Sequence, residues 1–94
     1  VAPGNTVKVG GDVSVPNAAA TLVLAADPDR LYALVKVPSS AADGVRFGPA
    51  AVGAASGILV EPGETLPIAT TAAIYAYQAS GGAITVNAAS VAEV

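Results

Sequence analysis

Two pairs of carboxylates are the side chains whose spacing comes closest to known chemistry. Asp27 and Asp29 form one pair, and Glu61 and Glu64 form the other. Paired carboxylates act as general acid and base when burial moves their pKa values apart. Both pairs lie in proline-containing turns, where we expect the carboxylates to be solvated and to hydrogen-bond the backbone. We therefore assign no catalytic residue to either pair.

The turn at Asp27 and Asp29 could also attract calcium, because oxygen-rich turns suit a hard cation. Calcium takes six to eight oxygen ligands, however, and two carboxylates in a rigid turn rarely supply that many. The sequence leaves calcium binding at this turn open, and we predict no metal site or cofactor.

Nucleophilic catalysis lacks a suitable base, since the chain has neither histidine nor cysteine. A serine could pair only with Lys8 or Lys36, and both lysines occupy expected exposed strand positions, whereas a catalytic lysine needs burial. An enzyme is therefore the last of three functional hypotheses. Its activity would have to depend on Lys36, Asp27 or Glu64.

The composition indicates one small domain with a thin core. The 94 residues are 53% apolar but only 4% aromatic, and 12% are charged. This share of charged residues is about half the usual one, which favours a protein that buries part of its surface in an assembly. The net charge is −3, and the four cations are scattered: Lys8, Arg30, Lys36 and Arg46. Scattered cations argue against direct nucleic-acid binding, and no apolar stretch approaches the ~20 residues of a membrane span.

Short β-branched runs between proline and glycine turns predict an all-β fold. About eight or nine short strands indicate a small antiparallel β-sandwich or a partly closed barrel. We expect residues 1–16 to form an N-terminal hairpin or arm and residues 17–94 to form the sandwich domain. The alanine-rich segment from Pro49 to Ala55 reads as a loop of small residues with at most one helical turn.

Register arithmetic predicts three hairpins, because opposed residues of an antiparallel pair share a face. The first has a three-residue loop, Gly10-Gly11-Asp12, that opposes Val9 to Val13 and Val7 to Val15.

The second hairpin turns at 61–65, so that Val60 opposes Leu66 and Ile58 opposes Ile68. Pro67 lacks an N–H and therefore indicates an edge strand or a bulge.

The third hairpin turns at Gly81-Gly82. It opposes Tyr77 to Val86 and Tyr75 to Ala88, which places both tyrosines inward or against a partner.

The middle of the chain predicts two strands joined by a turn at 27–30, where Pro28 takes the second position. Leu22 and Leu24 should share a face of the first strand. In the second strand one apolar face should contain Leu31, Ala33, Val35 and Val37, with Tyr32, Leu34 and Lys36 opposite. A short strand further on should bury Val45 and Phe47 and point Arg46 outward.

The few aromatic residues are expected to anchor an interface rather than to stack on a sugar or a base. Our interface candidates are Tyr32, Tyr75, Tyr77, Val7 and Val9.

Three segments resemble a known group of proteins. They are 22–35 (LVLAADPDRLYALV), 56–64 (SGILVEPGE) and 73–81 (AIYAYQASG). They are similar to motifs of the small β-sandwich virion proteins of tailed bacteriophages, which include head decoration and minor capsid subunits. The resemblance spans about Leu22 to Val86 and implies no catalytic residues.

The resemblance and the composition together lead to one expectation about function. The chain should be a non-enzymatic virion structural protein, such as a capsid decoration or head-stabilising subunit. It should form a homo-oligomer and contact the major capsid protein or another virion protein, without binding nucleic acid or a membrane. The alternative is a carbohydrate- or cell-surface-binding β module, suggested by the tyrosines and by the turn at Asp27 and Asp29.

Overall fold

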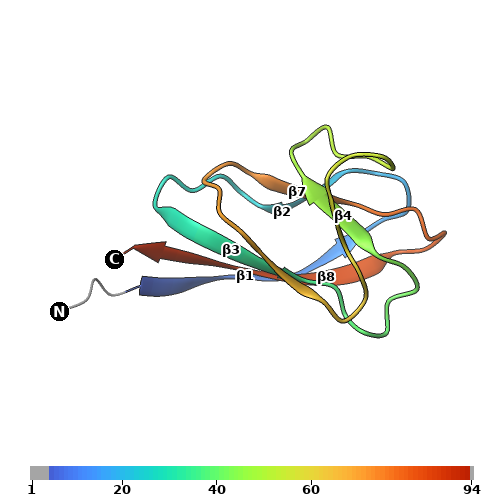
Figure 1. Ribbon diagram of the computed structural model, residues 1–94, viewed down its shortest axis with the longest axis horizontal. Coiled ribbons are helices and arrows are strands. Elements are labelled where there is room, and N and C mark those ends of the chain that lie inside the picture. Colours follow the sequence, from blue (N-terminus) through green and yellow to red (C-terminus); the bar gives the residue numbers. More distant parts are fainter. Residues whose placement is uncertain (1–4, 94) are drawn as a thin grey trace.

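The computed structural model describes the backbone of residues 5–93 and the side chains of residues 11–90. This part of the chain contains eight strands and no helix, which confirms the all-β prediction (Figure 1). The strands are β1 (Asn5–Val15), β2 (Thr21–Leu24), β3 (Arg30–Lys36), β4 (Val45–Gly48), β5 (Ile58–Val60), β6 (Thr65–Ile68), β7 (Ile74–Tyr77) and β8 (Ile84–Glu93).

The strands form two four-stranded antiparallel sheets, so the chain is a sandwich and not a barrel. The first sheet has the order β1-β8-β3-β6, and the second has the order β2-β7-β4-β5. Strand β1 therefore pairs with β8, β2 with β7, β3 with β6 and β4 with β5. This nesting of first with last strands is the jelly-roll arrangement of two Greek keys.

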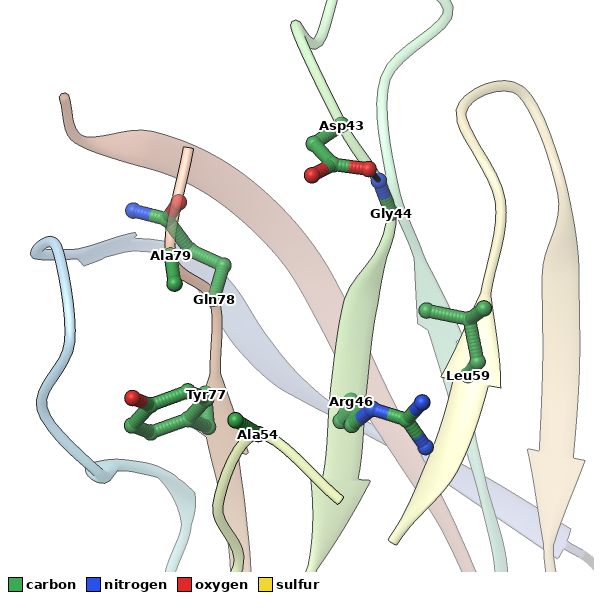
Figure 2. Close-up of a pocket in the computed structure, with 8 residues that line it drawn as sticks. All are labelled: Asp43, Gly44, Arg46, Ala54, Leu59, Tyr77, Gln78 and Ala79. Carbon is green, nitrogen blue, oxygen red and sulfur yellow. Dashed lines mark hydrogen bonds between the residues drawn. The ribbon is translucent and has the colours of Figure 1, made fainter. Parts of the chain in front are cut away.

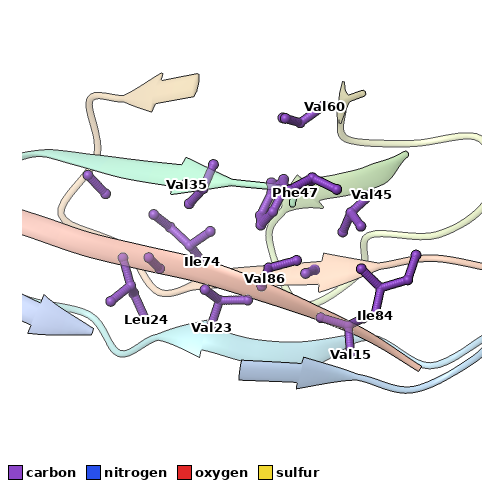
Figure 3. Close-up of a cluster of buried hydrophobic side chains, with 14 residues drawn as sticks. Val15, Val23, Leu24, Val35, Val45, Phe47, Val60, Ile74, Ile84 and Val86 are labelled. Atoms are coloured by element: carbon purple, nitrogen blue, oxygen red, sulfur yellow. The ribbon is translucent and has the colours of Figure 1, made fainter. Parts of the chain in front are cut away.

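The core lies between the two sheets and consists mainly of valine and alanine (Figure 3). Alternate residues along β4 point inward, so Val45 and Phe47 are buried, as predicted, while Arg46 between them is only partly covered. The largest fully buried side chains are Phe47, Val15, Val35, Val37, Val45 and Val86.

A β-bulge changes the predicted face of β3 at its first residues. Ala33, Val35 and Val37 are buried as expected, but Leu31 is 44% exposed. The register with β8 shifts between Arg30 and Tyr32, so that Arg30 is buried in place of Leu31. A similar shift in β2 leaves Leu22 exposed and contradicts its predicted shared face with the buried Leu24.

The predicted N-terminal hairpin is wrong. Residues Asn5–Val15 form one strand, β1, which pairs with β8 along its whole length. The glycines make a bulge between Val9 and Gly11 instead of a turn, and Gly11 has the positive φ (80°) expected of a glycine there. Strand β1 is therefore an edge of the first sheet and is not part of a separate hairpin.

The other two predicted hairpins are also wrong, because their strands belong to different sheets. Strands β5 and β7 lie in the second sheet, whereas β6 and β8 lie in the first. The 61–65 and 81–82 turns thus carry the chain across the sandwich. Pro67 does lie on an edge strand, β6, and the segment from Pro49 to Ala55 is a loop, as predicted.

Candidate functional site

The outer face of the second sheet gathers large side chains from all four of its strands. Tyr75 of β7 is opposite Leu22 of β2, and Arg46 of β4 is opposite both Tyr77 and Leu59. Because opposed residues share a face, these five side chains lie on the side of the sheet away from the core. We call this surface the Tyr–Arg face.

The loop between β4 and β5 packs on one end of this sheet. Its Val52 is buried, and a Cβ on Gly57 would come within 2.6 Å of Val52 Cγ2 and 2.9 Å of the Phe47 carbonyl oxygen. Gly57 also has a φ of 89°, which strongly favours glycine. A glycine is therefore required for the loop to lie this close to β4.

Between this loop and the strands lies an open pocket of about 230 Å³ (Figure 2). In Figure 2 Arg46 extends towards Leu59, Tyr77 lies on the side of β7 next to Ala54, and Asp43 lies just before β4. The remaining lining residues are Gly44, Gln78 and Ala79.

The two charged groups of the pocket keep unused hydrogen-bonding capacity. Nη1 of Arg46 donates one long bond, 3.4 Å, to the Gly57 carbonyl, although a guanidinium has five N–H donors. Oδ1 of Asp43 accepts the backbone N–H of Gly44 at 2.8 Å. Within the described residues, Arg46 and Asp43 form no ion pair with each other, so both can bind a further group.

The tyrosines of β7 point outward, so of the two placements predicted for them, inward or against a partner, the inward one is wrong. Tyr75 and Tyr77 are half-buried, while Ile74, Ala76 and Gln78 face the core. A buried glutamine was not expected.

The interior accommodates Gln78 because its amide is well bonded. It donates to the Val15 and Gly82 carbonyls and accepts both the N–H and the hydroxyl of Ser80.

Tyr32 is on the opposite side of the sandwich from the other two tyrosines. Its side chain is 38% exposed on the outer face of the first sheet, where Leu34, two residues further along β3, is also exposed. The register places Tyr32 in one row with Val91 and Val7, and Leu34 in one row with Ala89 and Val9. The side chains of Val7 and Val9 lie outside the described part. Tyr32 and the two tyrosines of β7 therefore belong to two separate faces.

Arg30 has a structural role that the sequence did not reveal. Only 5% of it is exposed, and its guanidinium donates to the carbonyl oxygens of Ala25, Thr70 (3.2 Å) and Ala72 (3.0 Å). It thereby ties the 25–29 and 69–73 loops to β3. Ordinary strand alternation predicts that Arg30 points to solvent, so no local signal could have identified this contact.

In each carboxylate pair, one side chain accepts a hydrogen bond from the backbone of its own turn. Oδ1 of Asp27 accepts the backbone N–H of Asp29 at 3.0 Å, and Oε1 of Glu64 accepts that of Glu61 at 2.9 Å. Among the described side chains, no three of the types that ligate metals gather at one place.

Lys36 is exposed on the outer face of the first sheet. It lines an open surface hollow together with Asp12 and Asn87, whose side chains are hydrogen-bonded to each other at 2.7 Å.

Comparisons with family models, curated proteins and solved structures found no match for this chain. The described residues also include no helix of the length and apolarity that crossing a membrane requires.

Proposed function

We propose that this chain is a non-enzymatic structural subunit of a virus particle, of the capsid decoration or head-stabilising type. It acts through contacts with neighbouring subunits. The observation that carries the proposal is the exposure of large apolar side chains on both sides of the sandwich. They are Leu22, Leu31, Tyr32, Leu34, Ile58 and Leu59.

Single exposed apolar residues are common and need no explanation, but a continuous group does. On the Tyr–Arg face, leucine, tyrosine and arginine adjoin one another in register. Tyrosine and arginine are also the residue types that contribute most to protein interfaces. This arrangement favours a protein partner over a small substrate.

The topology is compatible with the proposal but does not select it. Jelly rolls occur in viral capsid proteins and equally in lectins, so the fold supports both functional candidates by analogy alone. The resemblance of segments 22–35, 56–64 and 73–81 to phage virion proteins favours the first.

The proposed partners are the major capsid protein or another virion protein, and other copies of this chain. The charge distribution argues against nucleic acid. Arg30 is buried, and Lys36 and Arg46 project from opposite sheets, so the described cations do not form one basic surface.

The proposal can be tested on virus particles from the source of the chain. Antibodies raised against the recombinant protein should label intact particles in electron microscopy, and quantitative mass spectrometry should give a constant copy number per particle. The absence of the chain from all purified particles would refute a virion role.

The pocket of the Tyr–Arg face supports a second candidate, a carbohydrate-binding module. An aromatic ring beside polar groups with free hydrogen-bonding capacity suits a sugar, and Tyr77, Arg46 and Asp43 provide these elements. Calorimetry against a broad glycan panel, with and without calcium, tests it. Binding that is lost in Tyr77→Ala supports this function, and no heat across the panel contradicts it.

A further inference from the structure

We propose that the Tyr–Arg face is a two-fold contact between two copies of this chain, in which Arg46 of each copy pairs with Asp43 of the other. The inference deepens the proposed function, because it names one of the subunit contacts and its chemistry.

The charges of the pocket carry the argument. Arg46 and Asp43 line the same pocket, yet no ion pair joins them. Within the described residues, the side chain of each makes one hydrogen bond, and its partner is a backbone group. Four guanidinium N–H groups and one carboxylate oxygen thus remain for a partner. Arginine and a carboxylate form strong, charge-assisted hydrogen bonds.

The symmetry of a dimer selects a second copy as the occupant. In a two-fold contact, a surface meets the same surface in reversed order. A face that carries a cation and an anion at two separate points of one pocket, here Arg46 and Asp43, is complementary to its own reverse. The tyrosines and leucines around the pair would then pack against their counterparts.

The size of the face predicts how strong the contact is. Four strands spaced about 4.8 Å apart and three or four residues long present roughly 250 Å² per copy. A stable interface buries about 800 Å² per partner, so this contact alone is weak. We expect a dissociation constant between about 0.1 and 1 mM in solution, with stronger association only where several contacts act together.

Charge reversal provides the test. Arg46→Asp and Asp43→Arg each place like charges in both pairs of a homodimer. A mixture of the two variants restores opposite charges in both pairs. Lys36→Asp and Asp29→Arg are matched controls, because they make the same charge changes at exposed positions outside the face.

Sedimentation velocity of each protein between about 10 µM and 1 mM measures the association. The wild type and both controls should dimerise equally, each single variant should bind at least about tenfold more weakly, and the mixture should regain dimers. Thermal unfolding by circular dichroism should show that all variants are folded.

A wild type that stays monomeric at 1 mM, or reversals that leave association unchanged, would overturn the two-fold contact. Failure of the mixture to dimerise would overturn the Arg46–Asp43 pairing. None of these outcomes bears on whether the chain is present in virus particles, so the labelling experiment tests the proposed function separately.

Discussion

Replacement of Arg30 should be among the most destabilising single changes in the chain. In Arg30→Ala, the carbonyl groups of Ala25, Thr70 and Ala72 lose their donor, and a large buried side chain leaves a void. A hydrogen bond to a charged group contributes about 1.5–3 kcal/mol, and three would add up to more than single replacements usually cost. Bonds that share one side chain are not additive, and Nε has no partner within the described residues.

We therefore expect Arg30→Ala to lower the free energy of unfolding by about 3–4 kcal/mol. Arg30→Lys keeps the charge but lacks the planar fork, so it should lose about half as much. A domain of this size has a total stability of roughly 5–14 kcal/mol, so the alanine variant should still be folded in the absence of urea.

Urea unfolding followed by circular dichroism and tyrosine fluorescence is a suitable assay, because the chain has three tyrosines and no tryptophan. The matched control is Arg46→Ala, which removes an arginine that makes one 3.4 Å bond and should change stability by less than about 1 kcal/mol. If the two alanine variants unfold at the same urea concentration, the assigned role of Arg30 is refuted.

Four further changes test other contacts of the fold. Gln78→Ala should lower the free energy of unfolding by about 2–3 kcal/mol in urea, because the carbonyls of Val15 and Gly82 and the N–H of Ser80 lose their partner. A loss below about 0.5 kcal/mol would contradict a stabilising role of this hydrogen-bond network. Gly57→Ala should lower the free energy of unfolding by about 3 kcal/mol, since its Cβ would collide with the Phe47 carbonyl. Gly81 has a similar φ (97°) but free space around it, so Gly81→Ala should lower this free energy by only about 1 kcal/mol. Equal melting temperatures of the two variants would disprove the steric argument. Pro67→Val should leave the free energy of unfolding nearly unchanged but increase aggregation, because it adds a free N–H to the edge of the first sheet. Light scattering measures the aggregation, and an unchanged aggregation rate would count against edge protection by proline.

The alternation of side chains within strands was well predicted from the sequence. The inward rows of β3 and β4 follow from apolar residues at every second position. Prediction failed at the bulges near Arg30 and in β2, because one inserted residue reverses the face of every residue on one side of it. Sequence patterns contain little information about where such a bulge lies.

The pairing of strands could not be predicted from local register. Hairpins at the 61–65 and 81–82 turns would match the apolar faces of their strands, but the chain crosses between the two sheets at both turns. The entropic cost of closing a loop grows only slowly with its length, so distant partners such as β1 and β8 compete well with neighbours. Matching apolar faces therefore indicates which residues are compatible and does not identify which strands pair.

The candidate site was predicted only in part. Tyr75 and Tyr77 were expected to be interface residues, and the structure places them together on one outer face. Arg46 was predicted to point outward, but its position between Tyr77 and Leu59 depends on the strand order and could not be anticipated. In β7 both faces are rich in apolar residues, so periodicity did not reveal that Gln78 would be the buried one.

The pairing of β1 with β8 also determines how the fold responds to mechanical force. Asn5 is opposite Glu93, so the beginning of one strand and the end of the other lie together at one end of the molecule (Figure 1). Tension applied to these two residues acts along the interstrand hydrogen bonds, which lie perpendicular to the strands, and breaks them one at a time. The sandwich should therefore unzip at low force when pulled by its ends, and it should resist better a load that pushes on the faces of its sheets.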